Sequence, residues 1–305
     1  MTLPKISVQQ LAEAIQAPEE LAVLDPRDHN AYHAGHIFWA ASLRPENAES
    51  EAHKLVPRRS ARIVVTDDGN GEGRELYGVL KQNGWTDISL LDGGTQAWIE
   101  KGYEVYSGVN VPSKLFGELV ERHYQTPHVQ AQQLSEWISQ GRELLILDSR
   151  TQREFNRMNI PGGRSCPGGE LVYRIFDLLK ENTTVVVNCA GRTRSILGTA
   201  SLIRAGIPNP VVALENGTMG WELAGLQLEN GSTTVVGPPS ESAQQKAAAA
   251  AQQITDRFGV TRVTESTLQS WQSDTSRTLY LFDVRSPAEY ERGHRRHFRN
   301  APGGQ

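Results

Sequence analysis

The sequence predicts an α/β fold in which mainly parallel sheets carry helices on both faces, with this unit repeated in tandem along the chain. Short apolar and β-branched runs, such as Ile63–Thr66 and Val185–Val187, are each followed by a helical pattern. Strands that alternate with helices build a parallel sheet covered on both sides. Several short motifs also recur at the spacing of a whole domain, which predicts duplicated domains.

The repeats set the predicted domain organisation. The motif LDPR at 24–27 recurs 123 residues later as LDSR at 147–150, and after a further 135 residues as FDVR at 282–285. The motif LDGGT at 91–95 recurs 123 residues later as LENGT at 214–218. We therefore predict a first domain over 4–107, a helical linker over 108–127, a second domain over 128–230, a second helical linker over 231–259 and the N-terminal part of a third domain over 260–305.

The elements of the first unit follow from its apolar pattern. We expect a helix over 8–15, strands over 21–24, 63–66 and 88–91, and a helix from about 74 to a stop at Gly84. Trp98, like Trp221 in the second unit, is expected in the core because large aromatic side chains are usually buried.

The linkers and later units are justified in the same way. Pro112 and Pro127 bound a short helix over 114–123, and strands are expected over 144–147 and 185–187. The alanine- and glutamine-rich run that follows Ser240 predicts an exposed or edge-packed connector helix, with low-complexity disorder as the alternative.

The third unit contains an opening helix, a strand over 279–282 and the FDVR motif, but by the spacing of 135 residues its equivalent of the loop after strand 185–187 would lie beyond Gln305. Half a domain lacks the strands that close a core. We therefore expect this polypeptide to be a fragment or truncated product of a longer protein.

Composition describes a soluble globular protein and argues against several function classes. Hydrophobic residues make up 38% and charged residues 22% of the 305 residues. The formal net charge of -4 argues against general nucleic-acid binding, and no apolar run reaches the ~18 residues that a membrane span needs. No signal peptide is evident, and two cysteines cannot form a disulfide framework. We therefore expect a cytoplasmic protein without nucleic-acid or membrane partners.

A single thiol, Cys189, lies where a strand ends and a helix begins. Val185–Val187 predict the strand, and a helical pattern starts at Ser195. Arg192 and Arg194, together with the unpaired N–H groups of the first helical turn, favour the nucleophilic thiolate and also bind oxyanions. This arrangement indicates attack on an anionic substrate. The alternative is a buried, inert cysteine at a strand end.

The residues of this loop are Cys189, Ala190, Gly191, Arg192, Thr193, Arg194 and Ser195. The loop resembles the active-site loop of rhodaneses, the sulfurtransferases that carry sulfur as a cysteine persulfide. The resemblance implies that the thiolate attacks the outer sulfur of thiosulfate and that sulfite leaves. A second nucleophile, cyanide or a thiol, then takes the sulfur from Cys189.

The resemblance also implies a role for each position. Cys189 is the expected nucleophile, Arg192 and Arg194 bind the anionic end of the donor, and Asp148 and Arg150 brace the loop. The sulfur is cradled by the backbone N–H groups of Ala190, Gly191, Arg192, Thr193 and Arg194, and Ser195 completes the substrate-binding loop. Thiosulfate, 3-mercaptopyruvate and protein persulfides all suit an arginine-lined loop as donors. Cyanide, a thiol or a protein is the expected acceptor.

Two other functions stay open. Related phosphatases and arsenate reductases use a Cys-x5-Arg loop, whereas Cys189 to Arg194 is Cys-x4-Arg and the residue that would complete the longer loop is Ser195. The shorter loop favours sulfur over a phosphate. The other alternative is a non-catalytic or redox-sensing interaction module.

The first unit is expected to be catalytically silent. Aligned strand to strand, Asp67 takes the place of Cys189, and no persulfide can form on a carboxylate. The following replacements are Asp68 for Ala190, Asn70 for Arg192, Glu72 for Arg194 and Gly73 for Ser195. A cation site among these acids is the less favoured reading, because clustered loop acids are usually solvated. Packing or partner binding is the expected role of this unit.

We expect neither a metal nor a cofactor. His33 and His36 lack a third ligand at a spacing that suits zinc. The second cysteine, Cys166, is matched by Ala301 in the third unit, so its position does not require sulfur, and we interpret it as structural.

Overall fold

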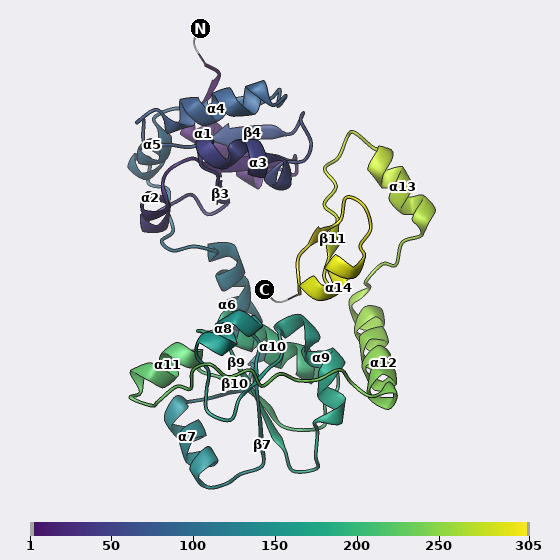
Figure 1. Ribbon diagram of the computed structural model, residues 1–305. Helices are drawn as coiled ribbons and strands as arrows, with labels where there is room; N and C mark the ends of the chain where they lie inside the picture. The colour runs from purple at the N-terminus through teal and green to yellow at the C-terminus, as the bar shows by residue number, and fades with distance from the viewer. Residues whose placement is uncertain (1–2, 304–305) are drawn as a thin grey trace. The chain divides into compact units, whose positions relative to one another are not determined.

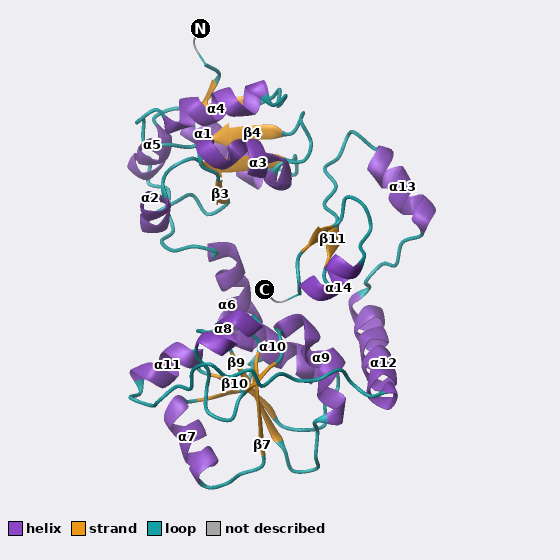
Figure 2. Ribbon diagram, viewed as in Figure 1, coloured by secondary structure: helices purple, strands orange, loops and turns teal. Residues whose placement is uncertain are grey.

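The computed structural model describes residues 3–303 (Figures 1 and 2). They divide into two compact units, which are described separately. One takes in the chain up to Pro112 together with Val263–Tyr280, and the other takes in Ser113–Arg262 together with the segment from Leu281. Each unit contains one five-stranded sheet in which every strand pair is parallel. The predicted α/β class with parallel sheets is confirmed.

The sheet of the first unit has the strand order β1-β5-β4-β2-β3. Its strands are β1 Lys5–Ile6, β2 Leu21–Asp25, β3 Ala40–Ser42, β4 Arg62–Val65 and β5 Ile88–Leu91. Its helices are α1 Val8–Gln16, α2 His29–Ala34, α3 Pro45–Leu55, α4 Glu72–Gln82 and α5 Gly94–Glu100.

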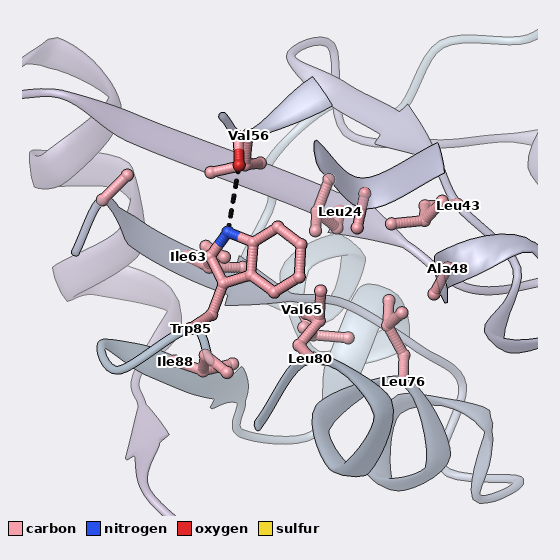
Figure 3. Packing of buried hydrophobic residues seen from close by; sticks show 12 residues of the cluster. Leu24, Leu43, Ala48, Val56, Ile63, Val65, Leu76, Leu80, Trp85 and Ile88 are labelled. Carbon is pink, nitrogen blue, oxygen red and sulfur yellow. Dashed lines mark hydrogen bonds between the residues drawn. The ribbon is translucent and has the colours of Figure 1, made fainter. Parts of the chain in front are cut away.

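Helices cover both faces of this sheet because successive strand residues point to opposite sides. Ile63 and Val65 of β4 pack into a core with helices α3 and α4, whereas Val64 packs into a second core with α1 and α5. Figure 3 shows the first of these cores, in which Trp85 is buried and donates its indole N–H to the carbonyl of Val56 at 3.0 Å.

The second unit repeats this architecture with the strand order β6-β10-β9-β7-β8. Its strands are β6 His128–Val129, β7 Leu144–Asp148, β8 Arg164–Ser165, β9 Thr184–Asn188 and β10 Val211–Leu214. Its helices are α7 Ala131–Ser139, α8 Gln152–Arg157, α9 Leu171–Arg174, α10 Thr193–Arg204 and α11 Gly217–Leu223, with short 3-10 turns at Gly168–Glu170 and Ile175–Asp177. Trp98 of the first unit and Trp221 of this one are both buried, as expected.

The central strand of the second sheet, β9, is buried from Val185 to Asn188. Val185 and Val187 of β9 face a core that contains residues of α9 and α10, while Val186 faces a core with α7 and α11. This burial on both faces explains the unbroken β-branched run at that point of the sequence. It also fixes the carboxyl end of β9 at the edge where α10 begins.

The remaining elements are α6 Val111–Tyr124, α12 Glu241–Phe258, α13 Glu265–Ser273, β11 Phe282–Asp283, α14 Pro287–Arg292 and β12 Arg299–Asn300. Helix α12 packs against α9, and its Ala243, Ala247 and Ala250 are buried, so the alanine-rich run is an edge-packed helix as expected. Strands β11 and β12 pair in parallel with each other. The domain boundaries drawn from the repeats stay a prediction.

Within residues 3–303, no helix combines the length and the apolar character that a membrane crossing requires.

Candidate active site

Cys189 lies directly after β9, in the loop that leads to α10. Both elements are labelled in Figure 1. The neighbouring strands β7 and β10 hold β9 between them, so the loop opens at the carboxyl edge of the sheet, where ligands of such sheets bind. The Cys189 side chain is buried, with 2% of the residue exposed, and its Sγ lies 3.5 Å from Oγ of Ser195. Ser195 Oγ donates in turn to the carbonyl of Arg192 at 2.8 Å.

Helix α11 anchors this loop from the side. The backbone N–H of Thr218 donates to the carbonyl of Cys189 at 2.9 Å, and that of Met219 donates to the carbonyl of Ala190 at 3.1 Å. Gly217 makes this approach feasible, since it has a φ of +54° and an added Cβ would lie 2.2 Å from the Cys189 carbonyl oxygen. Sequence reasoning missed this anchor, although the recurrence of LDGGT as LENGT signalled it.

The backbone N–H groups of this loop form a second feature of the site. Among the described residues, none accepts a hydrogen bond from the backbone N–H of any residue from Ala190 to Ser195. Such a run at the start of a helix carries partial positive charge and suits an anionic ligand.

The corresponding loop of the first unit shows where such donors converge. Asp67 occupies the position of Cys189, and its carboxylate accepts from the N–H of Gly69 at 3.1 Å and from the N–H of Gly73 at 3.0 Å. These two donors correspond to Gly191 and Ser195 in the second unit. The same loop geometry therefore directs two backbone N–H groups at the charged end of this side chain.

Arg194 is held by a partner that sequence reasoning missed. Its Nη1 donates to Oε2 of Glu154 at 2.9 Å and its Nη2 donates to Oε1 at 2.8 Å. The hydrogen bond to Arg194 is the main cause that lowers the pKa of Glu154 to about 2. The pKa of Arg194 is raised chiefly by Glu154, with further contributions from the charges of Cys189 and Asp148. The structure thus brings Arg194 into the electrostatic field of Cys189.

Arg192 has different surroundings. Its Nε donates to Glu118 at 2.9 Å, and its Nη2 contacts both Glu118 and Glu121 of helix α6. The pKa of Arg192 is raised by hydrogen bonding to Glu118 and by the charges of Glu121, Glu118 and Glu215. The guanidinium expected to bind a donor anion is therefore engaged by carboxylates of the linker helix.

Helix α6 packs closely on the loop at the same point. An added Cβ at Gly117 would lie 2.9 Å from Cγ2 and 3.2 Å from Cα of Thr193. Val120 of α6 is buried against Ile196 and Ala200 of α10. The segment predicted as a helical linker therefore forms one wall of the loop, which local sequence patterns did not indicate.

Asp148 and Arg150 form a buried ion pair at the end of β7. Arg150 donates to Asp148 through its backbone N–H, through Nε and through Nη2, the last at 2.7 Å, and Nη2 also donates to the carbonyl of Met158. Asn188, the last residue of β9, donates to the Asp148 carboxylate at 2.9 Å. The pair thus ties β7 to the strand that ends at the loop.

The other candidate groups have structural surroundings. Cys166 lies in the apolar core beside α9, where burial raises the pKa of its thiol to about 12. His36 is buried, stacks on Tyr32 and uses Nδ1 to contact the Tyr32 carbonyl. Across residues 3–303, no group of three or more His, Cys, Asp or Glu side chains is arranged to hold a metal.

Comparisons with known proteins agree with this geometry. A family model described as "Rhodanese-like domain" matches residues 7–101 and 130–224. The thiosulfate sulfurtransferase GlpE of Pseudoalteromonas translucida is 32% identical over 101 residues, which is 32% of this chain and 90% of that protein. GlpE of Shewanella oneidensis is 30% identical over 95 residues, covering 31% of this chain and 91% of that protein.

A crystal structure of a thiosulfate sulfurtransferase from Pseudomonas aeruginosa matches 99% of this chain with 46% identity and a TM-score of 0.96. The match covers 58% of that chain, so the present chain spans little more than half the length of that relative.

Proposed function

The chain belongs to the rhodanese-like domain family, and on that premise we propose that it is a sulfurtransferase whose second domain works through a persulfide on Cys189. One observation carries the proposal. Cys189 lies inside a loop whose backbone N–H donors have no acceptor among residues 3–303, and in the corresponding loop of the first unit two equivalent N–H groups donate to a carboxylate. A thiolate or a persulfide anion on Cys189 is stabilised by the same donors.

The first half-reaction transfers sulfur to the enzyme. The Cys189 thiolate attacks the outer sulfur of thiosulfate, a new S–S bond forms, and the S–S bond within thiosulfate breaks. Sulfite leaves with the electron pair of that bond, so no external oxidant is needed. Backbone donors of the loop stabilise the negative charge throughout, since they are fixed by the packing of α10 and α11 before the substrate arrives.

The second half-reaction restores the thiolate. A nucleophilic acceptor, cyanide or a thiol, attacks the outer sulfur of the persulfide, and the electron pair of the broken bond returns to Cys189. With cyanide the product is thiocyanate. The names of the GlpE proteins and of the solved Pseudomonas relative support thiosulfate as donor.

We assign Arg194 as the cation that interacts with the anionic sulfur donor. It lies within the field of Cys189, and Glu154 fixes its orientation through two parallel hydrogen bonds. Its role is to attract the anionic donor and to favour the departure of sulfite. Arg192 is bound to the linker helix, and we assign it to holding that helix on the loop.

A cyanide assay with thiosulfate tests the proposal. We expect Cys189→Ala to lose thiocyanate formation entirely, while Cys166→Ala keeps the wild-type rate because that thiol is buried and protonated. Asp67→Ala is expected to leave turnover near wild type, since the first unit has no thiol at this position. Undiminished turnover in Cys189→Ala would refute the proposal.

A further inference from the structure

The Asp-x-Arg motif is built in the same way in both complete domains. Arg27 and Arg150 each donate from the backbone N–H and from Nε to the Asp two residues earlier. Each also donates from Nη2 to that Asp and to the carbonyl of the residue eight positions later. The two guanidinium groups are therefore held in equivalent orientations.

The hydrogen-bond partner of one guanidinium nitrogen, Nη1, differs between the two domains. In the first unit, Nη1 of Arg27 donates to both carboxylate oxygens of Asp68, at 3.3 and 3.2 Å. In the second unit, Ala190 takes the position of Asp68, and its methyl group cannot accept a hydrogen bond. Within the described chain, Nη1 of Arg150 has no acceptor, although the Arg150 side chain is only 4% exposed.

We propose that Nη1 of Arg150 forms an oxyanion subsite beside Ala190, and that the anionic end of a thiosulfate-type donor binds there during transfer to Cys189. The proposal rests on the proposed sulfurtransferase function and deepens it. The Asp68 carboxylate in the silent domain marks the place and shows that an anion bonds to this edge of the guanidinium.

The position of the subsite matches the chemistry of the donor. In the silent loop the carboxylates of Asp67 and Asp68 belong to adjacent residues, one bound by backbone donors and the other by Arg27. In the working loop the first place corresponds to the sulfur of Cys189. A donor whose transferable sulfur is bonded directly to an oxyanionic group can bring that sulfur to Cys189 while the oxyanionic group lies at the adjacent place, beside Arg150.

Burial strengthens the expected interaction. A buried guanidinium gains more from a charged acceptor than an exposed one, because the local dielectric is low and water does not compete. Arg150 is more deeply buried than Arg194, whose side chain is 27% exposed. Replacing the Asp68 carboxylate by the Ala190 methyl thus leaves Nη1 of this largely buried side chain for a substrate group.

A matched pair of variants at Ala190 tests the subsite without touching Arg150 or Asp148. Ala190→Asp places a carboxylate where Asp68 lies in the silent domain, so it occupies Nη1 in place of the donor. Ala190→Asn has the same size without the charge. We expect Ala190→Asp to raise the KM for thiosulfate about tenfold more than Ala190→Asn does.

A second measurement separates this effect from a change in the thiol. The rate at which neutral iodoacetamide alkylates Cys189 reports the reactivity of its thiolate without any anionic substrate. Dividing kcat/KM for thiosulfate by this alkylation rate removes any effect of a variant on the thiolate. If this corrected kcat/KM is equal for the two variants, the subsite is wrong while the sulfurtransferase proposal stands. If the wild-type protein takes no sulfur from thiosulfate, the proposed function fails and the subsite with it.

Discussion

Glu154 and Arg194 face each other in a bidentate pair that joins the start of α8 to the start of α10, with both N···O distances below 3 Å. Glu154 also accepts from the backbone N–H and the hydroxyl of Thr151, which caps its own helix. One carboxylate therefore fixes both a helix end and Arg194, a cation whose pKa is raised in part by the charge of Cys189.

Removing the charge of Glu154 should weaken catalysis. Glu154→Gln keeps the size of the side chain but leaves Arg194 without its charged partner. We expect kcat/KM for thiosulfate to fall about tenfold, which corresponds to ~1.4 kcal/mol of lost orientation. Glu143→Gln, which removes an exposed ion pair with Lys180, is the control and should leave kcat/KM unchanged. Equal kcat/KM values for wild type and Glu154→Gln would show that Glu154 does not contribute to catalysis.

The same pair predicts a dependence of stability on pH. Glu154 has a pKa of about 2 in the fold against an ordinary value of 4.5. A group whose pKa is lowered by folding stabilises the fold above its unfolded value and loses this contribution as pH falls through the folded value. The stability advantage of wild type over Glu154→Gln should be complete at pH 7, shrink below about pH 5 and vanish near pH 2. Urea unfolding of both proteins across this pH range measures the difference in their free energies of unfolding. A difference that stays constant down to pH 3 contradicts the prediction.

Gly217 is expected to be essential for the shape of the loop. Gly217→Ala must hold a φ of +54° and place a methyl group 2.2 Å from the Cys189 carbonyl oxygen. The left-handed conformation alone costs ~1–2 kcal/mol, and the close contact adds to it. Gly225→Ala, at a φ of +74° with no atom within 4 Å, is the matched control. Thermal unfolding and thiocyanate formation should both be damaged more at Gly217, and equal damage at the two sites would count against the anchor.

The linker helix should tune the affinity for the donor. The double variant Glu118→Gln/Glu121→Gln frees Arg192 from two carboxylates and makes the loop more positive. We expect the KM for thiosulfate to fall roughly two- to fivefold, because partly exposed charges interact weakly. The decrease in KM should be smaller at high salt, which screens these charges. An increase in KM would mean that the pairs hold the loop in its working shape instead.

The sequence was informative where a feature is local. The buried run of β9 and the helix after it follow from neighbouring residues, although α10 begins at Thr193, two residues before the predicted Ser195. The structure places Cys189 between this strand and this helix as predicted. The repeats also located the corresponding loop of the first unit, in which Asp67 lies at the position equivalent to Cys189 as predicted.

Features that depend on distant partners could not be predicted. Glu154 is 40 residues from Arg194 and Glu118 is 74 residues from Arg192, so no periodic pattern links them. The edge strands β1, β6 and β8 have two residues each, too few to show alternation. Among the described residues Nη1 of Arg150 has no acceptor, and the importance of this became evident only by comparison with Arg27, whose Nη1 donates to Asp68 in the first unit.

The central claim is that Cys189 carries the sulfur, and the mass of its peptide tests this directly. After exposure of the full chain to thiosulfate, the peptide with Cys189 should gain the mass of one sulfur atom, the peptide with Cys166 should gain none, and cyanide should remove the added mass. A Cys189 peptide of unchanged mass under conditions in which thiocyanate forms would contradict the account.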